Sequence, residues 1–145
     1  MKKIDKSKEL YSSIRLVNNK LNFIGSVDDN QPISIDYIAP LGDNLGYTSL
    51  ELLLLSLSSC IGSAVLTFLR RMNKTIKNCD IKAQGLRREE HPTGFKNITV
   101  EILIESPELT NEDMIKVLKL TEDKYCPVYS MIKGNTDIHI NYKIK

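Results

Sequence analysis

The chain has 145 residues, of which 41% are hydrophobic, and this length and composition fit one domain, residues 1–145, with a packed core. The formal net charge is +2, with acidic and basic residues mixed along the chain, so charge gives no reason to expect nucleic acid as a partner. The N-terminal lysines precede no apolar run, and residues 50–57 are too short to span a bilayer, so we expect a soluble cytoplasmic protein without a signal peptide.

The N-terminal third of the chain predicts short strands. Residues 13–27 have the pattern of two short strands joined by a turn at Asn18-Asn19, a pair that tolerates positive φ. Apolar residues alternate again in residues 33–39, which predicts a third strand. Residues 40–48 are rich in Gly, Pro, Asp and Asn and are expected to form a loop.

A long helix follows this loop. Thr48 and Glu51 have the spacing of a capping box, which places the helix start at Thr48. The apolar pattern continues to residue 72 or 73. Arg70 and Arg71 would then lie in the last turn, where cations complement the helix dipole.

The C-terminal half predicts a hairpin, two helices and a last strand. Residues 79–106 indicate two strands with a turn near Pro92, and residues 110–124 have the spacing of an amphipathic helix capped by Thr110. Cys126 would cap a short third helix that begins at the following proline, and residues 138–144 alternate as a strand. About six strands and three segregated helices predict an α+β fold with a mainly antiparallel sheet.

Three cysteines, Cys60, Cys79 and Cys126, are the first candidates for chemistry. Their odd number, their wide spacing and the lack of a C-x-x-C motif argue against a disulfide scaffold and a thioredoxin-type site. Together with His91 and His139 they lack any standard zinc-ligand spacing, so we predict no metal site. Cys79 begins a predicted strand without an activating neighbour and is interpreted as structural.

Cys126 and Cys60 each leave two interpretations open. A thiolate of Cys126 at a helix N-terminus would face free backbone N–H groups that lower its pKa, although a Cys before Pro can also simply end a loop. Cys60 lies about three turns into its helix, beyond the reach of the N-terminal dipole, among small residues such as Ser56 and Ser63. It is therefore either a small apolar residue at a close packing contact or a thiol that needs a cation from elsewhere in the fold.

The run LELLLLSLSSC, residues 50–60, resembles the helix segment of the OsmC/Ohr family, in which Pro-x-Glu-Leu precedes apolar and small residues and then a Cys. RREEHPTGFKNITVEILIE, LTEDKYCPV and IHINYKI are similar to the OsmC-like branch of that family. The resemblance covers residues 46–145 well and the first 45 loosely. Its most specific feature is one Cys in the central helix combined with a Cys-Pro that opens a later helix.

This resemblance implies an intertwined homodimer with active sites at the subunit interface, and a peroxidase that uses thiols to reduce organic hydroperoxides in oxidative stress defence, with hydrogen peroxide as a further candidate substrate. Cys60 would be the peroxidatic thiol and Cys126 the resolving thiol, and Glu51 would hold the activating cation through an ion pair. A sulfenic acid on Cys60 would condense with Cys126 to a disulfide, which an external thiol or dithiol reduces. No bound cofactor, nucleic acid or membrane is expected.

The activating cation and the class of function stay open at this point. The family uses an Arg on its N-terminal hairpin, and the candidates in this chain are Arg15, Lys20, Arg87 and Arg88. Glu51 can equally serve only as part of the capping box. A non-catalytic dimeric protein that binds a small ligand, or a thiol-based redox sensor, would use the same fold.

Overall fold

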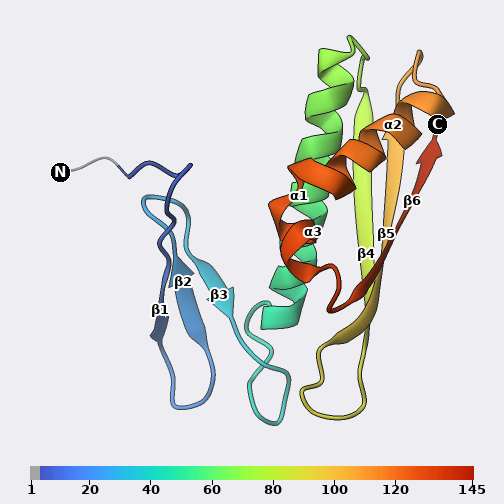
Figure 1. Ribbon diagram of the computed structural model, residues 1–145. Helices are drawn as coiled ribbons and strands as arrows, with labels where there is room; N and C mark the ends of the chain where they lie inside the picture. The colour runs from blue at the N-terminus through green and yellow to red at the C-terminus, as the bar shows by residue number, and fades with distance from the viewer. Residues whose placement is uncertain (1–3) are drawn as a thin grey trace. The chain divides into compact units, whose positions relative to one another are not determined.

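The computed structural model describes residues 4–145, in which strands and helices occur in separate blocks (Figure 1). In chain order the elements are β1 (Ser13–Leu16), β2 (Phe23–Ser26), β3 (Ile33–Ile35), α1 (Ser49–Arg71), β4 (Asn78–Arg87), β5 (Phe95–Glu105), α2 (Asn111–Leu120), the π-helical turn η1 (Thr121–Tyr125), α3 (Pro127–Ile132) and β6 (Asp137–Ile144). The chain divides into two compact units, Met1–Leu52 and Leu53–Lys145, so α1 begins in the first unit and runs on through the second.

The first unit contains a three-stranded antiparallel sheet in the order β1-β2-β3. Ile14 lies opposite Gly25, and Leu16 lies opposite Phe23, so the apolar residues of the two strands share one face of the sheet. Ile14 is 60% exposed and Leu16 is 49% exposed. The apolar face of this small sheet is therefore left largely uncovered.

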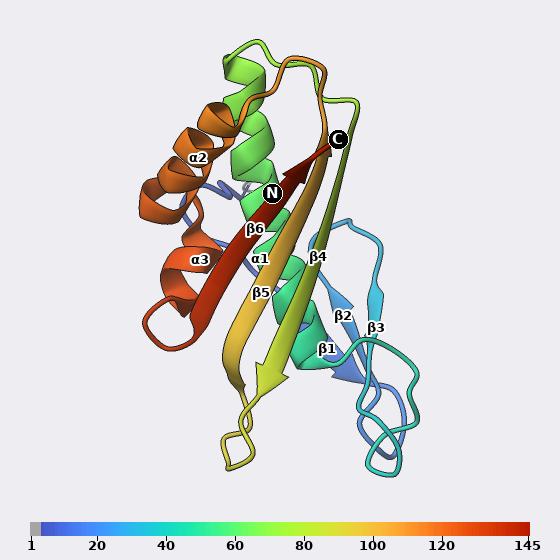
Figure 2. The same ribbon diagram turned by 90° about the vertical axis from the view of Figure 1, so that its right-hand side faces the viewer.

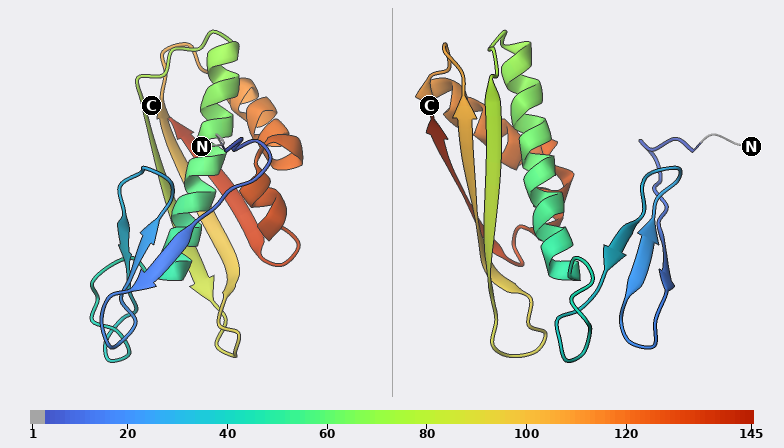
Figure 3. Two further views of the ribbon diagram at one scale, coloured as in Figure 1. Left: turned by 90° about the vertical axis from the view of Figure 1, so that its left-hand side faces the viewer. Right: turned by 180° about the vertical axis from the view of Figure 1, so that it is seen from behind.

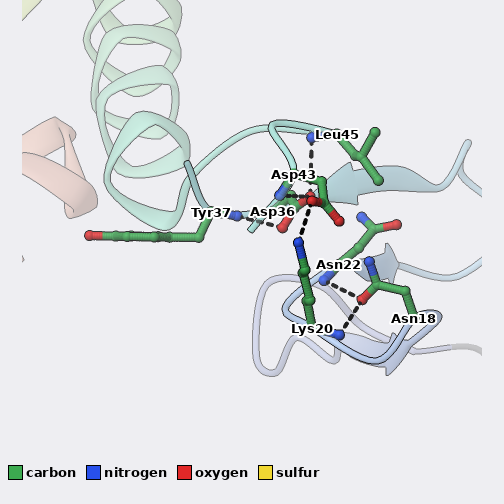
Figure 4. Close-up of polar contacts among 7 residues, drawn as sticks. All are labelled: Asn18, Lys20, Asn22, Asp36, Tyr37, Asp43 and Leu45. Atoms are coloured by element: carbon green, nitrogen blue, oxygen red, sulfur yellow. Dashed lines mark hydrogen bonds and ion pairs between the residues drawn. The ribbon is translucent and has the colours of Figure 1, made fainter. Parts of the chain in front are cut away.

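A buried carboxylate holds the loop that leads from β3 to α1 (Figure 4). Asp36 accepts hydrogen bonds from the backbone N–H groups of Tyr37 at 2.7 Å, Asp43 at 3.2 Å and Leu45 at 3.1 Å. Burial by itself raises the pKa of Asp36, but these N–H groups and the nearby Lys20 outweigh burial and lower the pKa. Lys20 also pairs with Asp43 at 2.7 Å, so its charge is used within the loop.

The second unit is a three-stranded sheet, in the order β4-β5-β6, with the helices on one of its faces. β4 and β5 pair antiparallel, whereas β5 and β6 pair parallel. Figures 2 and 3 show α1, α2 and α3 on the same side of this sheet, with the opposite face free of helices. The buried residues of β5 alternate along the strand and point to the helices; they are Ile98, Val100, Ile102 and Ile104.

α1 supplies the other half of this core. Leu57, Ile61, Val65 and Leu69 recur every four residues, so they share one face of the helix, and all four are fully buried. The helix passes close to β4 at Gly62, where an added Cβ would come within 2.7 Å of the Ile81 side chain. A small residue at this position lets helix and sheet approach closely.

α1 is also more apolar than the interrupted run of residues 50–57 led us to expect. Its 23 residues include an 18-residue window with a mean hydropathy of 2.1, which is enough to cross a membrane by length and composition alone. Only 28% of that window is buried. The buried face nevertheless packs on the sheet, which is the arrangement of a core helix.

The predicted α+β class is confirmed, and the helix starts and strand positions follow the sequence patterns closely. Four details differ from the prediction. The strand expected over residues 33–39 is short and ends at Ile35. The described strands form two sheets rather than one, β6 is parallel to its neighbour, and the helix expected over residues 110–124 ends at Leu120 and continues as the π-helical turn η1.

Candidate functional site

The start of α1 is built by the predicted capping box. The Thr48 backbone N–H donates to Glu51 Oε1 at 2.9 Å, and the Glu51 N–H donates to Thr48 Oγ1 at 3.2 Å. The hydrogen bond from the Thr48 N–H lowers the pKa of Glu51. Glu51 therefore has a defined role in starting the helix, whatever else it does.

Glu51 and Cys60 do not meet within one chain. They are nine residues apart on α1, which places them on opposite faces of the helix and about 13 Å apart along its axis. The predicted catalytic role of Glu51 thus requires a Cys60 that belongs to another chain. It stays a prediction.

Cys126 is placed by the π-helical turn and by α3. Its backbone N–H donates to the Thr121 carbonyl at 3.1 Å, which closes η1, and its own backbone is extended. Pro127 is the first residue of α3, as predicted, and Cys126 is the N-cap: its Sγ accepts the Tyr129 backbone N–H at 3.4 Å. The sulfur atom is held at this position, and only 2% of the residue is exposed.

The fold brings the two predicted thiols together. The side chains of Cys126 and Cys60 interact, so the middle of α1 and the start of α3 meet at a pair of sulfur atoms. Both cysteines are free, and Cys60 is the more exposed of the two. Neighbouring free thiols in this arrangement have the chemistry needed for reversible disulfide formation.

The pKa of Cys126 is raised to about 11, which corrects the expectation that a helix N-terminus would lower it. Burial is the main cause, because it disfavours the charged thiolate, and the neighbouring Cys60 side chain also favours the protonated form. The N–H groups of Tyr129 and Val128 act in the opposite direction but are outweighed. Cys126 is therefore a thiol that keeps its proton at neutral pH.

None of the groups that shift the pKa of Cys126 is a cation of the described chain. Arg87 hydrogen bonds to Thr93 in the β4–β5 turn, and Arg88 donates to the carbonyl of Asn135, between α3 and β6, at 2.9 Å, so both guanidinium groups are engaged. Arg15 on β1 and Lys20 both belong to the first unit.

The remaining candidates do not join the pair. Cys79 is half-buried on β4, opposite Ile104, and its pKa is raised by burial and by the neighbouring Asp80. Within residues 4–145 no cluster of three or more His, Cys, Asp or Glu side chains could hold a metal ion. Sequence reasoning did not single out Tyr129, whose N–H holds the Cys126 sulfur; the third residue after an N-cap is the position that would have indicated it.

Comparison with known proteins gives consistent results. The family model described as OsmC-like protein matches residues 42–141. Protein YhfA of Escherichia coli (strain K12) is 24% identical over 124 residues, which cover 86% of this chain and 90% of YhfA. Among solved structures, a hypothetical protein from Aquifex aeolicus VF5 is similar with a TM-score of 0.82 and 26% identity, covering 94% of this chain and 96% of that chain. The organic hydroperoxide resistance protein OhrB of Bacillus subtilis shares the fold with a TM-score of 0.64 and 18% identity, covering 93% and 98%.

Proposed function

Since this chain belongs to the OsmC family, with a match over residues 42–141, we propose that it is a thiol-dependent peroxidase that reduces organic hydroperoxides. The observation that carries the proposal is the neighbouring pair of free thiols, Cys60 and Cys126. The name of the Bacillus subtilis neighbour, an organic hydroperoxide resistance protein, supports the choice of substrate class. We propose the cytoplasm and oxidative stress defence as its setting.

The properties of the two thiols support different roles for them. Cys60 is the more exposed, so a hydroperoxide reaches it first. Its thiolate attacks the O–O bond, an alcohol leaves, and Cys60 becomes a sulfenic acid. The buried, protonated Cys126 then attacks the Cys60 sulfur: the S–S bond forms, the S–O bond breaks, and the hydroxide leaves with the Cys126 proton as water.

The resulting disulfide has to be reduced before the next turnover. An external thiol or dithiol attacks one sulfur, forms a mixed disulfide and is then displaced. No bound cofactor takes part in this cycle.

We also propose that the active form is a homodimer. Leu55 on α1 is 53% exposed. Ile14 and Leu16 on β1 are 60% and 49% exposed. Apolar surfaces of this extent usually mark an interface. A second copy would cover them and could bring Glu51 and a cation to Cys60. A folded, fully active monomer in analytical ultracentrifugation at assay concentration would contradict this proposal.

A redox sensor is the second candidate. It is favoured by one observation: no cation of the described chain acts on Cys126, so the pair could oxidise slowly and persist as a disulfide. A peroxidase turns over many equivalents of peroxide with a dithiol present, whereas a sensor is oxidised once and is reduced slowly.

The experiment compares wild type with Cys60→Ser and Cys126→Ser variants. Wild type is expected to consume cumene hydroperoxide continuously with dithiothreitol, and the Cys60→Ser variant not at all. Without dithiothreitol, the Cys126→Ser variant should react once and then accumulate sulfenic and sulfinic acid on Cys60, because no second thiol closes the disulfide. Intact mass and peptide mapping follow each product. The proposal is wrong if wild type consumes no peroxide, and the roles are reversed if the two variants exchange behaviour.

A further inference from the structure

Three side chains connect α1 with the residue that precedes Cys126. The rings of Phe68 on α1 and Tyr125 on η1 meet edge to face, with centroids 4.8 Å apart and an interplanar angle of 66°. The Arg71 guanidinium carbon lies 5.8 Å from the centroid of the Phe68 ring. Both geometries are favourable contacts for an aromatic ring. We call Arg71, Phe68 and Tyr125 the aromatic clamp.

The segment that carries Cys126 is held by local hydrogen bonds on both sides of the residue, including the Ser130 N–H that donates to the Cys126 carbonyl at 3.0 Å. It follows a π-helical turn, in which the Cys126 N–H reaches back five residues to the Thr121 carbonyl. Hydrogen bonding of this kind is rare and interrupts the regular helix. Beyond it, the Cys126 sulfur contacts the Tyr129 N–H and Cys60. Because η1 interrupts the regular helix before Cys126, side-chain contacts with α1 add to these local hydrogen bonds in placing the residue.

The clamp and the thiol pair touch α1 at two separate points. Cys60 and Phe68 are eight residues apart, which corresponds to about 12 Å along the helix axis and about 80° around it. Tyr125 contacts Phe68, and the next residue, Cys126, contacts Cys60. Two contacts restrain both the position and the orientation of a segment, whereas a single contact leaves it free to turn.

We propose that Phe68 and Tyr125 are positioning residues for disulfide formation: their ring contact holds the Cys126 thiol within reach of Cys60. The inference rests on the proposed function, since it concerns the step in which Cys126 attacks the oxidised Cys60. In that step the S–S bond forms, the S–O bond of the sulfenic acid breaks, and water leaves. Its rate depends on how much of the time the two sulfurs are in attacking geometry.

The clamp has no part in the first step. Cys60 lies in the middle of a long, regular helix, so its position does not depend on Tyr125. A variant that lacks the clamp should therefore be oxidised by peroxide at the normal rate but should close the disulfide slowly. Its Cys60 then stays longer as the sulfenic acid and is more often oxidised further to the sulfinic acid.

Tyr125 offers a matched pair of variants, because 51% of the residue is exposed and its replacement should leave the fold intact. Tyr125→Phe keeps the ring, and Tyr125→Ala removes it. The first measurement is the equilibrium of the reduced and oxidised protein with dithiothreitol, which gives the effective concentration of one thiol at the other. The second is the rate of disulfide formation after one equivalent of cumene hydroperoxide, followed by rapid quenching and mass spectrometry.

Tyr125→Ala should lower the effective concentration and the rate of disulfide formation by about threefold to tenfold, the range that an aromatic pair contributes. Tyr125→Phe should match wild type in both. Phe68→Leu, which keeps an apolar residue on α1, should resemble Tyr125→Ala. Circular dichroism confirms that each variant is folded.

Two results would overturn the inference. In one, Tyr125→Ala keeps the wild-type effective concentration. In the other, the Phe and Ala variants are equally impaired, in which case the hydroxyl and not the ring matters. The dithiothreitol equilibrium needs no peroxide, so it tests the clamp even if wild type proves to consume no peroxide and the proposed function fails.

Discussion

Cys126 should resist alkylation in the native, reduced protein. Its pKa rises from an ordinary value of 9.0 to about 11, chiefly because it is buried. A shift of about two units lowers the thiolate fraction at pH 8 about 100-fold, and the thiolate is the species that reacts with iodoacetamide. Limited access to a residue that is 2% exposed should slow the reaction further. We therefore expect native Cys126 to react at least about 100-fold more slowly than in the unfolded chain.

The assay exposes reduced protein to short pulses of iodoacetamide at pH 8, with and without denaturing urea, and counts labelled peptides by mass spectrometry. The Cys60→Ser variant is the control for the thiol pair. Since burial is the larger cause of the raised pKa, Cys126 should still be alkylated slowly in that variant. Labelling of native Cys126 within about tenfold of its unfolded rate would refute the reasoning from burial.

The same shift predicts how stability depends on pH. The unfolded chain ionises Cys126 near its ordinary pKa of 9.0, whereas the folded protein keeps the proton up to about 11. Burial of the neutral thiol therefore favours the fold fully below pH 9, and this contribution is lost as the pH rises to about 11. Denaturation in urea at pH 8 and pH 10.5, compared with a Cys126→Ser variant, should show a smaller pH dependence in the variant.

Three further predictions concern assembly and packing. Refolding a Cys60→Ser chain together with a Glu51→Ala chain should restore up to about half of the wild-type activity per mixed dimer if Glu51 serves the partner subunit; no recovery, with mixed dimers confirmed by mass, would show that it does not. Gly85→Ala should lower the free energy of unfolding by about 1–3 kcal/mol, since the new methyl group would collide with the Phe95 ring, and an unchanged urea midpoint would contradict this packing. Thr110→Ala should cost about 1 kcal/mol by removing the α2 N-cap, and Thr110→Ser, which keeps the hydroxyl, should restore most of it.

Local patterns in the sequence were sufficient for most elements. The capping box of Thr48 and Glu51 starts α1 as predicted, and Cys126 caps the short helix that opens at Pro127. The alternation of residues 98–104 marks the buried face of β5. These features depend on neighbours within a few residues, and hydrogen bonds and periodicity at that range can be identified from the sequence alone.

Strand pairing and the π-helical turn could not be predicted in this way. An alternating strand looks the same whether its neighbour is parallel or antiparallel, so β6 carries no local sign of its direction. The apolar spacing of α2 continues smoothly to Thr121, and a single change from four-residue to five-residue hydrogen bonding leaves the pattern intact. The direction of β6 and the change from α2 to η1 are therefore decided by tertiary packing and not by the local sequence.

The sequence alone determined that Cys126 caps a helix and that Cys60 lies in mid-helix. The tertiary structure decided that the two side chains meet and that Cys126 holds its proton. The sign of the pKa shift depends on how many distant atoms surround the sulfur, and burial outweighs the nearby N–H groups that the local sequence indicates. A thiol's local motif therefore predicts where it lies on its own helix, whereas its charge depends on segments that are far away in the sequence.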